Sequence, residues 1–292
     1  NTTNSSSSSS SSFWNTTTNC QCQALFVNQF ENRANYHIHY TTTGPEIWKD
    51  VMTYHHNHNS NTSTTTTKMI DAFCMSSGTG GTIAGVSHYL KEQDPNIQIV
   101  LVDPPGSALY HKVTHGVAYA PQQRERGMKR HRYDTLAEGI GLDRVTSNFA
   151  QAIIDTALQV SDQDAVDMAH YLLELEGLWM GSSSAMNLVG AVQTALSMPP
   201  HSQVVTVMCD GGQRHLTRFW NRDFIVHEWG LQWPGDDTDD DDNDNDDDDT
   251  DDDTNKDQGD WNTAATPHKS RTTTTNRRRI PACLQELPNK EG

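Results

Sequence analysis

The chain has 292 residues, enough for one large domain or two small ones, and a formal net charge of −17 at pH 7. Fourteen of these negative charges are aspartates between residues 236 and 253, so the rest of the chain carries only −3. A nearly neutral body without a basic patch excludes a surface built for nucleic-acid phosphates. The sequence contains no run of 18 apolar residues, the length that a membrane-spanning helix needs. The aspartate run is interpreted as a solvated, self-repelling segment; the alternative is a docking site for a cation or a histone-like partner.

Three polar tracts divide the chain. Residues 1–23 and 55–67 are rich in Ser, Thr, Asn and His, and residues 235–279 are polar and charged throughout. Such segments bury too little apolar surface to offset the entropy of ordering, so we expect them to be disordered. A globular domain is therefore predicted over residues 24–234, interrupted by the 55–67 insert and followed by a C-terminal tail at 280–292.

Neither the cysteines nor the histidines predict a metal site. The five cysteines lack CxxC spacing, and their odd number indicates a reducing compartment. The cluster His55-His56-Asn57-His58 lies in a polar insert without acidic or cysteine partners, so we expect it not to bind a metal specifically. The cysteines are Cys20, Cys22, Cys74, Cys209 and Cys283.

The first half of the domain has the pattern of a βαβ unit. Apolar residues at nearly helical spacing predict a helix over 24–36, and a proline after a glycine predicts a helix start within 42–52. An apolar strand is expected at 69–75, a helix at 82–93, and a second, almost wholly apolar strand at 97–103. Strands that are apolar on both faces are typical of a covered parallel sheet.

The alternation continues toward the C-terminus. Residues 111–138 are interpreted as a long loop with short elements, and 147–160 as a helix running into a strand. A capped helix is expected at 161–177, another at 184–197, and a strand followed by a glycine turn at 203–212. Alternating strands and helices predict an α/β fold, a parallel sheet between two layers of helices.

A glycine-rich loop follows the first strand and opens the helix at 82–93. Its sequence is Ser77-Gly78-Thr79-Gly80-Gly81-Thr82. Glycines let successive amides point inward, and the helix N-terminus adds free N–H groups and a positive dipole end, so the loop can cradle one phosphate. It lacks the GK[ST] ending of a P-loop and does not fit the GxGxxG dinucleotide fingerprint. The alternative is a tight turn without a ligand.

The stretch SSGTGGTIAGVSHYLKEQDPNIQIVLVDPPGS resembles the phosphate loop of cysteine synthases and cystathionine β-synthases, fold-type II enzymes that depend on pyridoxal 5′-phosphate. Four further segments resemble the family in the same order: QFENRANYHIHYTTTGPEIW, AEGIG, EGLWMGSSSAMN and CDGGQRHL. The resemblance covers most of residues 24–220. The GTGGT form of the loop is that of the sulfhydrylases and cystathionine synthases, and the tail RFWNRDFIVHEWGLQWP resembles the fungal-type cysteine synthases.

The resemblance implies roles for nine residues. Ser183 matches the serine whose hydroxyl meets the pyridine nitrogen of the cofactor; its alternative role is a helix N-cap, and both could hold at once. The EGIG loop implies a backbone substrate pocket, or else a flexible glycine turn. The residues implied to bind the cofactor phosphate are Gly78, Thr79, Gly80, Gly81 and Thr82, and those of the substrate pocket are Gly139, Ile140 and Gly141.

The family's Schiff-base lysine and its substrate-binding TSGN-like loop have no counterpart in this sequence. We therefore expect the chain to be the C-terminal part of a larger enzyme and to be inactive alone, with no catalytic residue of its own; a non-catalytic paralogue is the alternative. The parent reaction is expected to be cysteine formation from O-acetylserine, or serine, and sulfide, with cystathionine synthesis as the second possibility. A third reading is a binding protein that pairs with a genuine synthase. The resemblance also implies a homodimer, in the cytoplasm or mitochondria.

Overall fold

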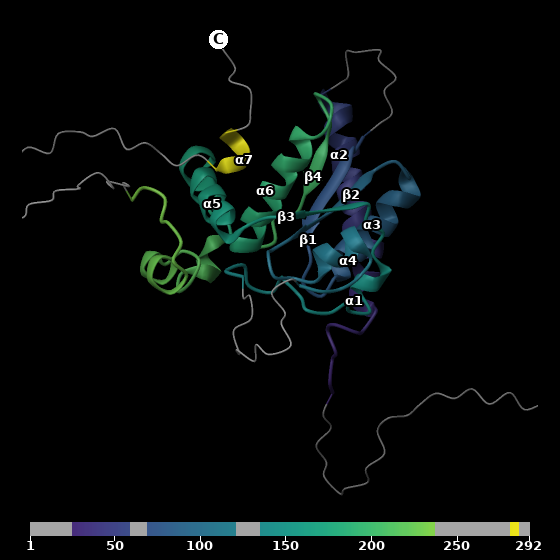
Figure 1. The fold of residues 1–292 in the computed structure, drawn as a ribbon. Coiled ribbons are helices and arrows are strands. Elements are labelled where there is room, and N and C mark those ends of the chain that lie inside the picture. The colour runs from purple at the N-terminus through teal and green to yellow at the C-terminus, as the bar shows by residue number, and fades with distance from the viewer. Residues whose placement is uncertain (1–24, 59–68, 121–134, 237–280, 286–292) are drawn as a thin grey trace, which may run out of the picture.

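A computed structural model describes residues 25–58, 69–120, 135–236 and 281–285 of the chain. At its centre lies a parallel sheet of four strands in the order β3-β2-β1-β4 (Figure 1). The strands are β1 (Ala72–Ser76), β2 (Gln98–Asp103), β3 (Thr156–Gln159) and β4 (Val204–Thr206). The predicted parallel sheet is confirmed.

Helices cover both faces of this sheet, and β1 and β2 are therefore buried on both sides. Cys74 and Val102 face a core shared with α5 and α6, whereas Phe73 and Leu101 face a second core shared with α2, α3 and α4 (Figure 1). The three-layer α/β architecture is therefore confirmed. The helices are α1 (Ala34–Ile38), α2 (Gly44–His58), α3 (Gly81–Gln93), α4 (Leu109–His115), α5 (Asp162–Glu176), α6 (Ser182–Leu196) and α7 (Ala282–Gln285).

The N-terminal helices differ from the prediction. Residues 25–33 are not helical, because Asn32 bonds the backbone at Val27 and Ala34 and offers the chain an alternative to a helix. Nor does a helix start near Pro45: α1 continues through a π-helical turn, His39–Thr43, directly into α2. The helix α2 also extends through His58, so the first four residues of the expected disordered insert are helical. Residues 59–67 lie outside the described part.

The helix expected within 147–160 is wrong; only a single 3₁₀ turn, Phe149–Gln151, precedes β3. Side-chain hydrogen bonds hold this segment in place beside the single turn of backbone bonds. The Thr146 hydroxyl accepts from the Phe149 N–H, the Ser87 hydroxyl accepts from the Ile153 N–H, and Asn148 accepts from the backbone of Tyr36. The strand predicted after it is confirmed.

The later helices agree with the sequence. In α5 the Ser161 side chain accepts from the Asp164 N–H, and Gly177 ends the helix in the left-handed conformation, as predicted. The helix α4 starts two residues before the stretch 111–138, for which a long loop with short elements is expected, and extends into it. At the C-terminus, α7 packs on the core shared by α5 and α6 through the buried Cys283 (Figure 1).

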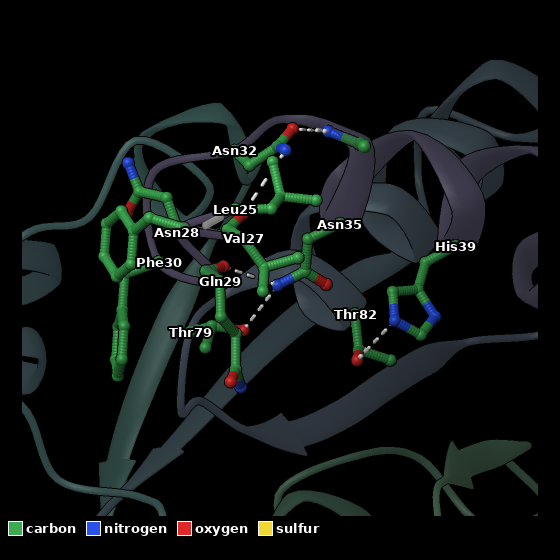
Figure 2. Close-up of a pocket in the computed structure, with 12 residues that line it drawn as sticks. Leu25, Val27, Asn28, Gln29, Phe30, Asn32, Asn35, His39, Thr79 and Thr82 are labelled. Carbon is green, nitrogen blue, oxygen red and sulfur yellow. Dashed lines mark hydrogen bonds between the residues drawn. The ribbon is translucent and has the colours of Figure 1, made fainter. Parts of the chain in front are cut away.

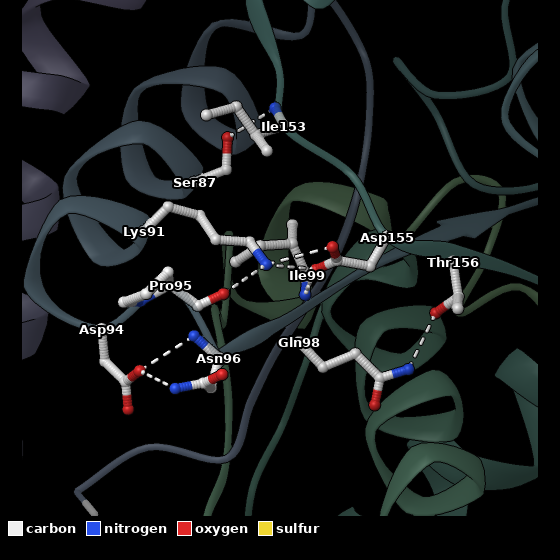
Figure 3. A network of polar contacts seen from close by, with 10 residues as sticks. All are labelled: Ser87, Lys91, Asp94, Pro95, Asn96, Gln98, Ile99, Ile153, Asp155 and Thr156. Atoms are coloured by element: carbon white, nitrogen blue, oxygen red, sulfur yellow. Dashed lines mark hydrogen bonds and ion pairs between the residues drawn. The ribbon is translucent and has the colours of Figure 1, made fainter.

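A polar network fixes the amino end of the sheet (Figure 3). The carboxylate of Asp155 accepts from the backbone N–H of Ile99 and pairs with the ammonium group of Lys91. The same ammonium donates to the Pro95 carbonyl. The end of α3 is thereby tied to the starts of β2 and β3. Within the described residues, no helix is both long and apolar enough to cross a bilayer.

Candidate functional site

The candidate site lies at the carboxyl edge of the sheet. The chain runs from β1 to β2 and β3 on one side, while β4 lies on the other side of β1. The strand order therefore reverses between β1 and β4, and in open α/β sheets ligands bind outside the strand ends at such a point. Two helices start at this edge on opposite faces of the sheet, α3 after the glycine loop and α6 after Gly181.

The glycine loop needs its glycines for two different reasons. Gly80 has φ +87°, a left-handed conformation, and a Cβ there would lie 2.6 Å from the Phe149 backbone. At Gly78 a Cβ would collide with the carbonyl oxygen of Gly139. The loop is held from outside by Thr146, whose hydroxyl donates to the Thr79 carbonyl at 2.7 Å. This backbone can come very close to a ligand, but it leaves no room for side chains.

A cavity of about 280 Å³ lies against this loop. Its wall includes Gly78, Thr79, Gly80 and Thr82 together with Gly139 of the EGIG loop. Ser77, which also lines it, is buried, and its hydroxyl has no hydrogen-bond partner among the described residues. A buried hydroxyl without a partner is costly, so this atom indicates a ligand or water in the cavity.

A second, larger cavity of about 940 Å³ adjoins the outer side of the loop (Figure 2). Here Asn35 donates to the Thr79 hydroxyl at 2.8 Å, and the His39 ring lies 3.2 Å from the Thr82 hydroxyl. Partial burial lowers the pKa of His39, so its ring is neutral at pH 7. Leu25 and Val27 line the same cavity and are highly exposed. Both loop threonines therefore have side-chain partners, one from α1 and one from the π-helical turn that follows it.

The opposite wall of the edge is the first turn of α6. Ser183, the second residue of this helix, is half-buried and does not line the 280 Å³ cavity. The next residue, Ser184, is fully buried and holds the chain after β4: its hydroxyl accepts from the Cys209 N–H at 2.8 Å and donates to the Asp210 carbonyl. Ser184 thus has a structural role, and Ser183 beside it in the first turn of the helix bonds the Cys209 side chain.

The structure brings five of the nine residues singled out in the sequence into one cavity. Gly81 is buried beside Asn35, while Ile140 packs into the core and Gly141 packs against Pro104. Sequence reasoning missed Ser77 and also missed Gln29 and Phe30, which line the same cavity. The serine pair before the first glycine could have indicated Ser77, whereas the approach of residues 29 and 30 depends on tertiary structure.

Backbone dipoles provide the positive potential of this cavity. Its lining contains no charged side chain. Positive potential therefore comes from the loop amides and the N-terminus of the 13-residue α3. Within the described residues, no group of three or more His, Cys, Asp or Glu side chains could hold a metal ion. The cavity accordingly suits the phosphate of an organic molecule better than a metal-bound polyphosphate.

Comparison with family models decides the classification. Residues 15–210 match the model described as "Pyridoxal-phosphate dependent enzyme". The chain belongs to this family. The family's cofactor fits the residues present at the phosphate end, because glycines without room for a Cβ, a helix N-terminus and the unpartnered Ser77 hydroxyl lie together at the cavity. The expected membership and cofactor are confirmed.

Within the pyridoxal-phosphate dependent enzymes, the chain is similar to cysteine synthases. It is 46% identical over 205 residues to Cysteine synthase 2 of Schizosaccharomyces pombe, covering 70% of this chain and 48% of that one. It is 32% identical to cystathionine beta-synthase of Apis mellifera, covering 67% and 33% respectively. A solved structure, O-acetylserine dependent cystathionine beta-synthase from Helicobacter pylori, is 30% identical with a TM-score of 0.49, covering 65% and 51%. The chain thus spans about half the length of the cysteine synthase relative.

Proposed function

We propose that residues 24–234 are the cofactor-phosphate-binding domain of a cysteine synthase that converts O-acetylserine and sulfide to cysteine. One observation carries the proposal: a glycine loop with an unpartnered buried hydroxyl opens onto a cavity at the start of α3, in a chain 46% identical to a fungal cysteine synthase. The lower identity to a cystathionine beta-synthase, 32%, makes cystathionine formation the less favoured reaction.

In this proposal the chain's residues bind and orient the cofactor. The amides of Gly78, Gly80 and Gly81 and the hydroxyls of Ser77 and Thr82 donate to its phosphate, and the α3 dipole stabilises the negative charge. Thr79 contributes its amide, and its hydroxyl accepts from Asn35.

Ser183 donates to the pyridine nitrogen. A neutral hydroxyl there, in place of a carboxylate, leaves the ring nitrogen without a proton. The cofactor itself supplies an electron sink that labilises bonds to the substrate's α-carbon.

The EGIG loop forms the substrate side of the cavity. Gly139 lines it through its backbone, and Glu138 is held by an ion pair of 3.0 Å with Arg218. We assign no catalytic lysine within the 292 residues. The substrates, O-acetylserine or serine with sulfide, are carried over from the resemblance. A homodimer and a cytoplasmic or mitochondrial location stay predictions.

Ser77→Ala tests the cofactor site without disturbing the fold. The full chain is titrated with pyridoxal 5′-phosphate, and bound cofactor is measured by absorbance and tryptophan quenching, with inorganic phosphate as competitor. The variant removes a hydroxyl that has no partner in the described structure, so stability should not fall. Affinity should drop by about tenfold, the loss of one hydrogen bond to a charged group.

Ser87→Ala is the matched control. Ser87 is also fully buried, but its hydroxyl donates to the Ala84 carbonyl and accepts from the Ile153 N–H. This variant should lose about 1–2 kcal/mol of stability and keep its affinity for the cofactor. If Ser77→Ala binds pyridoxal 5′-phosphate as tightly as the parent chain, the loop is not the anchor and the proposal fails.

A further inference from the structure

The side chain of Asn187 bridges β1 and β4 where their pairing stops. Its carbonyl oxygen accepts from the Ser76 N–H at 2.7 Å, and its amide donates to the Val207 carbonyl at 2.8 Å. The parallel ladder between the two strands ends at the pair Cys74–Thr206. The Asn187 amide therefore replaces the next rung of the ladder, and it holds the strands in the place where their order reverses.

This bridge also joins the two halves of the proposed cofactor site. Ser76 directly precedes the glycine loop, so its N–H fixes the point from which the loop departs. Asn187 lies one helical turn after Ser183, on the same helix. Three residues before it, Ser184 holds the backbone of Cys209. A single buried amide thus connects the β1 end, the β4 end and the first turn of α6.

We propose that Asn187 is a positioning residue that sets the span between the phosphate-binding loop and the pyridine-contacting Ser183. The inference rests on the proposed cofactor site and names a residue to which that proposal gives no role. A cofactor held at both ends needs the two subsites at a fixed separation, because a displacement of either removes one set of contacts. Inorganic phosphate occupies the loop alone, and its binding is insensitive to that separation.

The two ligands therefore distinguish a positioning role of Asn187 from a general effect on stability. We compare the full chain with Asn187→Ala by calorimetric titration with two probes, pyridoxal 5′-phosphate and inorganic phosphate. Affinity for pyridoxal 5′-phosphate should fall by about tenfold or more, and affinity for inorganic phosphate by less than about twofold. A residue with only a structural role would weaken both ligands in the same proportion.

Thr194→Ala is the control on the same helix. Thr194 is equally buried, and its hydroxyl donates to the Gly190 carbonyl at 2.7 Å within α6. This variant also loses a buried side-chain hydrogen bond, so its melting temperature should fall. Its affinity ratio, the affinity for pyridoxal 5′-phosphate divided by the affinity for inorganic phosphate, should match that of the parent chain.

Asn187→Asp gives a second readout through pH. A protonated carboxyl can accept from Ser76 and donate to Val207, whereas a carboxylate repels the Val207 carbonyl. The Asn187 amide also donates to the Cys209 thiol at 3.5 Å, and burial raises the pKa of this thiol from 9.0, so the thiol stays protonated between pH 5.5 and 8. Burial raises the pKa of a carboxyl group, so the affinity ratio should be low at pH 8 and return toward that of the parent near pH 5.5. The parent chain measured at each pH corrects for titration of the ligands.

The outcomes distinguish the two proposals. An unchanged affinity ratio in Asn187→Ala, or no recovery of Asn187→Asp at low pH, overturns the positioning role and leaves the cofactor site standing. A parent chain that binds pyridoxal 5′-phosphate no more tightly than inorganic phosphate overturns both.

Discussion

The carboxylate of Asp155 lies 2.8 Å from the ammonium nitrogen of Lys91 while its other contact, the backbone N–H of Ile99, donates to it at 2.7 Å (Figure 3). One side chain thus serves an ion pair and a strand backbone together. The Lys91 side chain is largely covered, with 15% of its surface exposed, and Asp155 has 38% exposed. The two contacts make different contributions, and substitutions can separate them.

We expect Asp155→Asn to lower the free energy of unfolding by less than about 1 kcal/mol, because the amide oxygen can still accept from Ile99 and only a partly exposed ion pair is lost. Asp155→Ala should cost about 1–2 kcal/mol more, since the Ile99 N–H then loses its acceptor. Urea denaturation measures both. Equal losses in the two variants would show that the ion pair carries the whole effect.

Gly80→Ala should be much more destabilising than Gly116→Ala. Both glycines have positive φ, +87° and +77°, so both substitutions carry the cost of a left-handed conformation, about 1 kcal/mol. Only at Gly80 does the new Cβ also collide with the Phe149 backbone, whereas nothing lies within 4 Å of a Cβ at Gly116. We expect a difference of about 2 kcal/mol or more in thermal or urea unfolding. Similar losses would mean that Phe149 moves away easily.

His170 should make the protein less stable in mild acid. Burial between Trp220 and Trp233 lowers its pKa from 6.5 to about 4, and its Nε2 atom has no hydrogen-bond partner among the described residues. The unfolded chain takes up the proton first, so stability present above pH 6.5 is lost as the pH falls toward 4.

The measurement is the difference between the parent chain and His170→Phe in urea unfolding at pH 7.5 and pH 4. The difference in unfolding free energy, variant minus parent, should be about 2 kcal/mol more favourable at pH 4 than at pH 7.5. This is less than the full pKa shift implies, because the His170 side chain is only partly buried. A pH-independent difference would contradict a depressed histidine pKa.

Asp103 should have the opposite pH dependence. Burial at the end of β2 raises its pKa from 3.8 to about 6, and Tyr110 donates its backbone N–H to one carboxylate oxygen. The folded state keeps the proton longer than the unfolded chain, so the contribution is complete below pH 3.8 and is lost as the pH rises to about 6.

Asp103→Asn is therefore expected to stabilise the chain by about 1–2 kcal/mol at pH 8, an advantage that disappears at pH 4. The gain is smaller than the full pKa shift implies, because the new amide brings buried donors of its own. Urea unfolding at the two pH values measures it, and a variant that is destabilised equally at both would refute the raised pKa.

Much of the fold follows from the sequence because it depends on local patterns. The apolar runs that form β1 and β2 require a sheet covered on both faces, and the alternation of strands with helices requires parallel pairing. The two ends of α5 could be predicted from the sequence, because the caps Ser161 and Gly177 each act within one turn of the helix. The glycine loop could be predicted too, since glycine is the residue that most readily adopts the left-handed conformation of Gly80.

Tertiary structure decided where segments bond to distant partners instead of to themselves. The sequence predicts a helix within 147–160, but the Ser87 hydroxyl accepts from the Ile153 N–H and the Asn148 side chain accepts from the backbone N–H of Tyr36. The first residues of the domain likewise fold against Asn148, whose amide donates to the Phe30 carbonyl 118 positions earlier. The bridge from Asn187 to Ser76 is invisible in the sequence for the same reason: a buried amide finds its partners across the sheet, and no local periodicity records that choice.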